Sequence, residues 1–229
     1  MDIPPDTVLF TIPRPSILNV ANSELSKKLP QLFIPEPDNE DDKNEDDQSS
    51  ESNPWTSLIL TMIYEFLQGE KSTWKTYFDI LPSHFDTLMF WTDEELSELQ
   101  GSTVRQKVGK AEAEAMFYKK ILPALKNYAD VFYPEGTKPL TDTEILALAH
   151  RMGSLIMSYS FELDKDDDEE DAEADEDNVQ DGWVEDRDAQ TLAMLPMADI
   201  LNSDAEFNVS SLPACWVREM GLTGNLGSC

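Results

Sequence analysis

Basic residues are scarce in this chain, and that shortage excludes one large class of function. The 229 residues include 17 Lys and Arg against 46 Asp and Glu, which gives a formal net charge of −29. A protein that binds nucleic acid needs many Lys and Arg to neutralise the phosphates. The charge balance therefore excludes a general nucleic-acid binder.

Cysteines and long apolar runs are also few. Cys215 and Cys229 are the only cysteines, too few for a disulfide framework, so we expect a reducing compartment. No apolar run approaches the roughly 18 residues of a transmembrane helix. No basic stretch precedes the first apolar residues, as it would in a secretory signal. These absences predict a soluble intracellular protein without a membrane partner.

Standard catalytic and metal-binding motifs are missing as well. The sequence contains no GxGxxG, GxxxxGK[ST], HExxH or CxxC motif. The only histidines, His84 and His150, are expected to be structural or solvated rather than general bases. The acidic runs lack the glycine turn and regular ligand spacing of a calcium-binding loop. We therefore predict no metal site.

Acidic residues are abundant, and they are concentrated in two segments. Residues 36–51 hold nine acids and one Lys, and residues 162–188 hold sixteen acids and two basic residues. The two segments carry −8 and −14 of the net charge of −29, and the rest of the chain carries the remaining −7. Such segments bury too little apolar surface to offset their ordering entropy. We expect disordered loops over 36–52 and 162–190.

Between these loops, over 53–161, the sequence predicts a block of helices. One helix should start at Pro54 behind the N-cap Asn53 and stop near Gly69. Its apolar side chains recur at helical spacing, namely at Trp55, Leu58, Ile59, Met62, Ile63 and Phe66. A longer helix is expected from about Ser102. The buried face of that helix should hold Val104, Val108, Ala111, Ala115, Tyr118 and Leu122.

Two capping boxes mark further helix starts, Thr92 with Glu95 and Thr141 with Glu144. The second should begin a helix that runs to about Tyr159. Before the first acidic loop, residues 7–12 favour a strand that ends at Pro13.

A short helix is expected around Glu24 to Leu29. The apolar residues from Leu192 predict a second β segment over about 192–209.

Four segments together resemble a known family. Residues 195–202, LPMADILN, look like its P-M-A-D-x-x-N-H motif, and residues 74–82, WKTYFDILP, resemble its W-x-x-Y-F-x-x-L-P signature. Residues 158–161, SYSF, resemble a segment that lines its lysine channel, and residues 6–13 look like an early strand of its domain. The family is the SET-domain protein-lysine methyltransferases of the Rubisco large-subunit methyltransferase-like class.

This resemblance implies an α+β fold dominated by helix, in which partial SET-domain β segments flank a large helical insertion. The implied organisation is a partial N-terminal SET segment over 1–35, the helical insertion over 53–161 and a partial C-terminal SET segment over 191–210. Residues 211–229 look unrelated to the family. The chain would then carry the middle of the family's domain and lack both ends.

The resemblance also implies a cofactor, S-adenosyl-L-methionine, and the residues that bind it. Ser158, Tyr159 and Asp199 would lie at the lysine channel and the methionyl end of the cofactor, and Asn202 and Ser203 occupy the Asn-His positions of the motif. The family's catalytic tyrosine belongs to a later segment, and no tyrosine follows Tyr159. No catalytic residue is therefore assigned.

Three interpretations remain open. The first is a protein-lysine N-methyltransferase that acts on a basic protein such as a ribosomal protein or a histone. The second is a catalytically inactive acidic interaction protein that binds basic partners through charge. The third is an incomplete chain that does not fold alone. The resemblance suggests a location in the nucleus or cytoplasm, with the nucleus slightly favoured.

Overall fold

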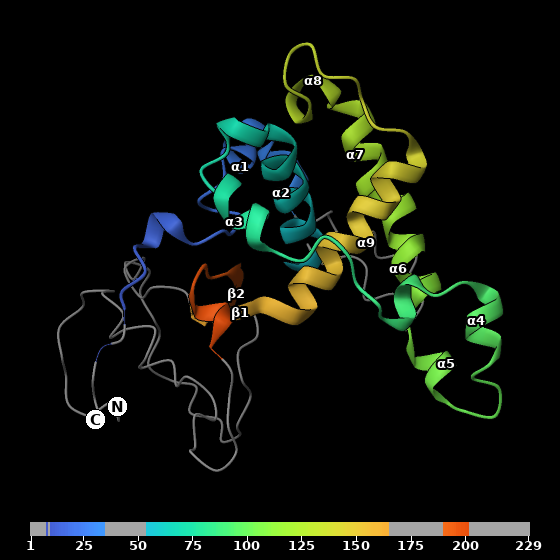
Figure 1. Ribbon diagram of the computed structural model, residues 1–229. Coiled ribbons are helices and arrows are strands. Elements are labelled where there is room, and N and C mark those ends of the chain that lie inside the picture. Colours follow the sequence, from blue (N-terminus) through green and yellow to red (C-terminus); the bar gives the residue numbers. More distant parts are fainter. Residues whose placement is uncertain (1–7, 9, 35–53, 165–189, 202–229) are drawn as a thin grey trace, which may run out of the picture.

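The computed structural model describes residues 8, 10–34, 54–164 and 190–201, and Figure 1 shows their arrangement. Helices make up most of these residues, and a small antiparallel sheet lies beside them. The expected helix-dominated α+β class is therefore confirmed. Within the described ranges, no helix combines the length and apolar character needed to cross a membrane.

Two long helices, α2 (Pro54–Gln68) and α9 (Asp142–Tyr159), form the centre of the helical block. The prediction of a helix from Pro54 to the neighbourhood of Gly69 is confirmed, and so is its apolar stripe. More of α2 is buried than the apolar stripe predicts, however, because other helices enclose it on most sides (Figure 1). Polar and aromatic side chains of α2 are buried with the stripe: Thr56, Ser57, Thr61, Tyr64 and Glu65.

Shorter helical elements surround this pair. On the N-terminal side are η1 (Arg14–Ser16), α1 (Glu24–Lys28), which confirms the expected short helix, and η2 (Pro30–Leu32). After α2 come η4 (Gly69–Lys71), α3 (Lys75–Ile80), η5 (Leu88–Phe90), α4 (Asp93–Ser97), α5 (Val104–Lys107), α6 (Lys110–Met116), a π-helical turn (Phe117–Ile121), α7 (Leu122–Asn127) and α8 (Ala129–Phe132).

Both capping boxes are confirmed. The Thr92 hydroxyl accepts the Glu95 backbone N–H at the start of α4, and the Thr141 hydroxyl accepts that of Glu144 at the start of α9. In each box the glutamate carboxylate accepts the threonine backbone N–H in return. Each box therefore supplies partners for backbone groups that a helix start leaves free.

The expectation of one long helix from Ser102 is wrong. The chain forms α5, then turns at Gly109, whose φ of +69° lies in the left-handed region, and continues as α6. A left-handed residue interrupts an α-helix, and glycine adopts that conformation without a side-chain clash. The turn changes which face is buried, because Val104 and Tyr118 are exposed whereas Phe117 and Ile121 belong to the core.

The sheet has two antiparallel strands, β1 (Ser160–Asp164) and β2 (Gln190–Met194). Phe161 pairs with Ala193, and Ser160 pairs with Met194. The second β segment is thus confirmed at its start only, since Ala198–Ile200 form a 3-10 turn, η9, and 202–209 lie outside the described residues. Residues 162–164 and 190, expected in the second acidic loop, belong to the strands, while 165–189 and the first acidic loop, 36–52, lie outside the described residues.

The expected strand over 7–12 is not formed by the described residues of that range. The N-terminal part instead reaches the sheet at Leu18, which exchanges two backbone hydrogen bonds with Met194, at 3.0 and 2.9 Å. A β-favouring run becomes a strand only where a neighbour supplies a ladder of partners. Here Pro13 and η1 turn the chain before it reaches the sheet, so that its only pairing with β2 among the described residues is the bridge between Leu18 and Met194.

The second half of β2 packs against apolar side chains on both faces, which fits its apolar sequence, Leu192 to Met194. Leu192 and Met194 pack against the main helical core. Ala193 on the opposite face belongs to a second cluster, made of Ile12, Ile17, Leu163, Ala193, Leu195 and Ala198. This second cluster holds the end of β2 and the following turn against the N-terminal segment.

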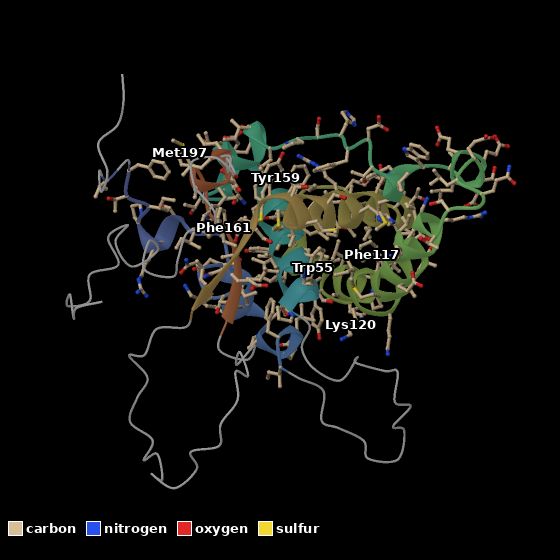
Figure 2. The ribbon with its side chains drawn as sticks, turned by 90° about the horizontal axis from the view of Figure 1, so that it is seen from below. Trp55, Phe117, Lys120, Tyr159, Phe161 and Met197 are labelled. Atoms are coloured by element: carbon tan, nitrogen blue, oxygen red, sulfur yellow. The ribbon has the colours of Figure 1, made fainter. Side chains whose placement is uncertain are left out.

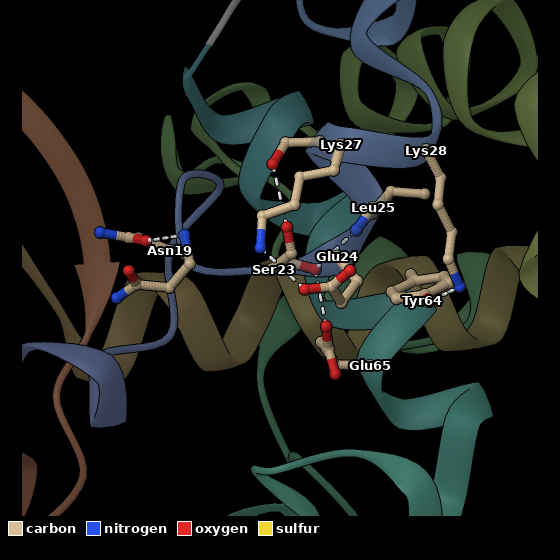
Figure 3. A network of polar contacts seen from close by, with 10 residues as sticks. Asn19, Ser23, Glu24, Leu25, Lys27, Lys28, Tyr64 and Glu65 are labelled. Atoms are coloured by element: carbon tan, nitrogen blue, oxygen red, sulfur yellow. Dashed lines mark hydrogen bonds and ion pairs between the residues drawn. The ribbon is translucent and has the colours of Figure 1, made fainter.

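A buried carboxylate joins three elements of the helical block, and Figure 3 shows one of its two contacts, that between Glu65 and Ser23. Glu65 on α2 accepts the Ser23 hydroxyl at 2.6 Å and the Ser72 hydroxyl at 2.7 Å, one on each oxygen. The two serine oxygens in turn accept the backbone N–H groups of Leu25 and Trp74. Both carboxylate oxygens therefore have partners, as a buried charge requires.

Candidate functional site

The turn after β2 holds the residues that best fit a binding site. Ala198 donates its backbone N–H to the Leu195 carbonyl at 3.2 Å, which closes a turn around Pro196 and Met197. Met197 has φ +78° and ψ −35°, close to the third residue of a type II turn, a place where glycine is usual. A non-glycine residue in that region stores roughly 1–3 kcal/mol of strain. Such strain is typical of functional segments.

Asp199 is the charged residue of this turn, and it is bound to the helical block. Its Oδ2 accepts the hydroxyl of Tyr77 on α3 at 2.6 Å, across 122 positions of the chain. Tyr77 is buried, and both its burial and the neighbouring Asp199 carboxylate raise the pKa of its hydroxyl far above the ordinary value. The tyrosine is therefore a hydrogen-bond donor across the physiological pH range.

The second oxygen of Asp199 differs from the first. Oδ1 is shielded from solvent and has no hydrogen-bond partner among the described residues. Leaving a buried acceptor unpaired costs roughly 1–3 kcal/mol, and more for a charged group. An oxygen of this kind can accept a hydrogen bond from a ligand N–H or O–H group.

Tyr77 is a site residue that sequence reasoning did not select. It lies in the 74–82 segment that carries part of the family resemblance, while Asp199 lies in the 195–202 segment. The hydrogen bond between them joins the two segments in space. The only hint in the sequence was that both segments resemble motifs of the same family. Nothing in the sequence alone indicates that these two side chains contact each other.

The other predicted residues lie around the strands. Ser158 and Tyr159 are the last residues of α9, directly before β1. The Ser158 side chain is exposed, and its hydroxyl donates to the Ser154 carbonyl at 2.9 Å. Tyr159 is half-buried and packs against the main core. Asn202 and Ser203 lie outside the described residues.

Figure 2 shows Tyr159, Phe161 and Met197 at the end of the molecule that carries the two strands. Several large apolar side chains near these elements in sequence are exposed to solvent. They are Ile80 at the end of α3, Met157 near the end of α9, and Met197, Ile200 and Leu201 in the turn. The two elements that carry Tyr77 and Asp199, α3 and the turn, thus also carry exposed apolar side chains.

Neither histidine lies in this turn. His84 is exposed in the loop after α3. His150 on α9 is half-buried between the rings of Phe117 and Phe90, and its Nε2 lies 3.3 Å from a Glu114 carboxylate oxygen. Burial lowers the pKa of His150 despite the opposing effect of Glu114. In the described part of the chain, no group of three or more potential ligands could hold a metal ion.

Comparison with known proteins gives consistent similarities. The chain is 32% identical over 202 residues to ribosomal lysine N-methyltransferase 4 of Saccharomyces cerevisiae, covering 87% of this chain and 37% of that protein. It is 27% identical over 210 residues to the N-lysine methyltransferase SETD6 of Mus musculus, covering 89% of this chain and 36% of that protein. No family model matches the sequence.

A solved structure shares the fold. It is the SET domain of LSMT bound to methyl-lysine and AdoHcy, with a TM-score of 0.52 and 23% identity, covering 90% of this chain and 37% of that chain. The chain spans a little over a third of the length of these relatives. By sequence and fold, the chain belongs to the SET-domain protein-lysine methyltransferases of the Rubisco large-subunit methyltransferase-like class.

Proposed function

We propose that this chain carries cofactor- and lysine-binding residues of an S-adenosyl-L-methionine-dependent protein-lysine N-methyltransferase. The observation that carries the proposal is the Asp199 carboxylate in a strained turn, fixed by Tyr77 at one oxygen, with its other, shielded oxygen unpaired among the described residues. The similarity to a lysine methyltransferase over 87% of the chain supports the same function.

The chemistry of lysine methylation sets what such a site must do. When bound, S-adenosyl-L-methionine supplies a methyl group on a sulfonium, and the neutral lysine amine takes that methyl while the sulfur keeps the bonding electron pair. Lysine has a pKa near 10.4, so freeing its lone pair near pH 7.4 costs about 4 kcal/mol. An apolar channel disfavours the ammonium form and helps this deprotonation.

The residues around the turn suit these tasks. Asp199 Oδ1 can accept a hydrogen bond from a donor group of the cofactor or of the lysine substrate. Ser158, Tyr159, Asn202 and Ser203 are proposed to bind the cofactor with it. Exposed apolar side chains, Met157 and Met197 among them, offer the kind of surface that a channel needs. Orientation of the reacting amine is the main contribution expected of such a site.

We propose that the substrate is a basic protein, such as a ribosomal or histone-like protein, and not a nucleic acid. A net charge of −29 attracts basic partners over long range and repels nucleic acid. This attraction should weaken as salt rises, because screening shortens the reach of exposed charges. We place the activity in the nucleus or cytoplasm, which localisation of a fluorescently tagged chain would check.

The charge also favours a second function, that of an acidic interaction protein without methyltransferase activity. Residues 36–51 and 162–188 together carry −22 of the net charge of −29. Charge alone would then bind basic partners. The two functions differ in one respect, since only the first requires the cofactor.

Calorimetric titration with S-adenosylhomocysteine, the product form of the cofactor, tests the proposal. We expect saturable binding by the chain and its loss in Asn202→Ala. Asn127→Ala is the matched control, because Asn127 is an exposed residue at the end of α7. Absence of binding by a chain shown to be folded would contradict the methyltransferase proposal and favour the acidic interaction protein.

A further inference from the structure

We propose that Tyr77 is a positioning residue, which holds the 195–201 turn in its binding conformation through Asp199. The inference deepens the proposed function, because the turn is the segment proposed to bind the cofactor. It assigns to the helical block a direct part in shaping the site, although Tyr77 itself is not placed against cofactor or substrate.

The turn has few other restraints. In the part of the chain that the structure describes, its backbone hydrogen bonds join only residues within the turn, and the N–H of Asp199 lies 3.4 Å from the Leu195 carbonyl oxygen. Ile200 and Leu201 are exposed, so Leu195 and Ala198 supply its burial. Met197 adds strain at φ +78°. A segment with few buried contacts opens easily unless another element holds it.

Tyr77 can hold the turn because its own helix is well anchored. The Trp74 indole N–H donates to the Ser16 carbonyl at 2.9 Å, and the Phe78 ring packs edge-on against Phe66 of α2 with centroids 5.8 Å apart. Tyr77 is 5% exposed, so the packing around its ring fixes the direction of its hydroxyl independently of Asp199.

The geometry also explains why one carboxylate oxygen stays free. The Tyr77 hydroxyl occupies Oδ2, and no described residue competes for Oδ1. A carboxylate held at one oxygen keeps the other in a fixed place for a ligand donor. Pre-orientation of this kind reduces the ordering that binding would otherwise require.

Hydrogen exchange of the ligand-free chain tests the inference without reliance on the cofactor. In Tyr77→Phe, which keeps the ring and loses the hydroxyl, exchange over 195–201 should be at least about tenfold faster, the factor expected for a lost hydrogen bond to a charged group. Tyr133→Phe is the matched control. Tyr133 is another buried tyrosine and directly follows α8, which Figure 1 shows well away from the strands.

A double-mutant cycle separates positioning from packing. If Tyr77 acts through Asp199, Tyr77→Phe should cause no further acceleration in an Asp199→Ala background. Tyr77→Phe should also weaken S-adenosylhomocysteine binding several-fold, while Tyr133→Phe leaves it unchanged. Equal exchange in the two tyrosine variants, or an undiminished Tyr77→Phe effect beside Asp199→Ala, would overturn the inference. A wild-type chain that binds no cofactor would instead refute the proposed function, and the exchange data would still decide the role of Tyr77.

Discussion

Two carboxylates, Glu65 in the helical block and Asp199 in the turn after β2, both accept side-chain hydroxyl groups from outside their own elements. Glu65 has a donor on each oxygen, and its serine partners are themselves hydrogen-bonded to backbone groups. Among the described residues, Asp199 has a donor on one oxygen only. Glu65 is thus a completed structural contact, whereas Asp199 keeps an acceptor available for a ligand.

The backbone around each residue shows the same contrast. Glu65 lies in the last turn of α2, within the helix. Asp199 follows Met197, the one non-glycine residue with positive φ in the described part of the chain. We therefore expect stability and the proposed binding to depend on different regions, so that substitutions should separate the two properties. Strain and unpaired polar groups are tolerated where function requires them.

The largest loss of stability should come from Glu65→Ala. The substitution leaves the Ser23 and Ser72 hydroxyls without their acceptor in the core, so we expect the free energy of unfolding to fall by about 3–5 kcal/mol. Urea unfolding followed by circular dichroism measures this. Glu70→Ala removes a side chain that is 90% exposed and should change stability by less than about 0.5 kcal/mol. Similar losses in both variants would refute the structural role of Glu65.

Asp199→Asn should weaken cofactor binding and leave stability nearly unchanged. The amide oxygen can still accept the Tyr77 hydroxyl, but the NH₂ group then replaces the free oxygen and faces the ligand donor. We expect S-adenosylhomocysteine binding to weaken at least tenfold, roughly 1.4 kcal/mol, with stability nearly unchanged. Calorimetric titration beside Asp130→Asn, an exposed aspartate of α8, checks this. Unchanged affinity in Asp199→Asn would show that Oδ1 accepts no ligand donor.

His150 should make the stability of the helical block depend on pH. Its pKa is lowered from the ordinary 6.5, first by burial, while the Glu114 carboxylate opposes the shift and Lys110 adds to it. The unfolded chain therefore takes up the proton at higher pH than the folded chain. The stabilising contribution is present above pH 6.5 and is lost as pH falls below that value.

Melting temperatures between pH 7.5 and 5.5 measure this dependence, which His150→Gln should flatten. Loss of stability from carboxylates with lowered pKa, such as Glu95 and Glu144, belongs below about pH 4.5 and does not overlap. His84→Gln, in an exposed loop, should keep the wild-type profile. A His150→Gln profile identical to that of the wild type would refute the assignment.

The smallest expected effect is that of Met197→Gly. Glycine relieves the left-handed strain but adds entropy to the unfolded chain, and the two nearly cancel. We expect stability to rise by less than about 1 kcal/mol, measured as a small increase in melting temperature. A clear decrease would show that the exposed Met197 side chain, and not its backbone geometry, matters for the turn.

Local signals predicted the helix starts and ends well. Capping boxes at Thr92 and Thr141 involve residues three positions apart, so the sequence contains the whole interaction. The fragmented helix after Ser102 was missed because one left-handed glycine, Gly109, outweighs a matching apolar pattern. The described residues of 7–12 do not form the predicted strand, because strand formation depends on a distant neighbour.

In the candidate site, too, local features could be predicted from the sequence and contacts between distant residues could not. Asp199 was selected through a local motif, and its assignment to the site stays a prediction; its segment forms a turn with Met197 at positive φ. The pairing with Tyr77 could not be predicted, because it joins residues 122 positions apart across two elements. The half-burial of His150 was likewise beyond the sequence, since Phe90 and Glu114 come from other helical elements.

Hydrogen exchange of the wild-type chain with and without S-adenosylhomocysteine tests the proposed binding of the cofactor at the strands and the following turn. We expect added protection over 158–164 and 190–201, with α4 and α8 unchanged. Protection absent from 190–201, or confined to helices distant from the turn, would show that the cofactor does not bind at this turn.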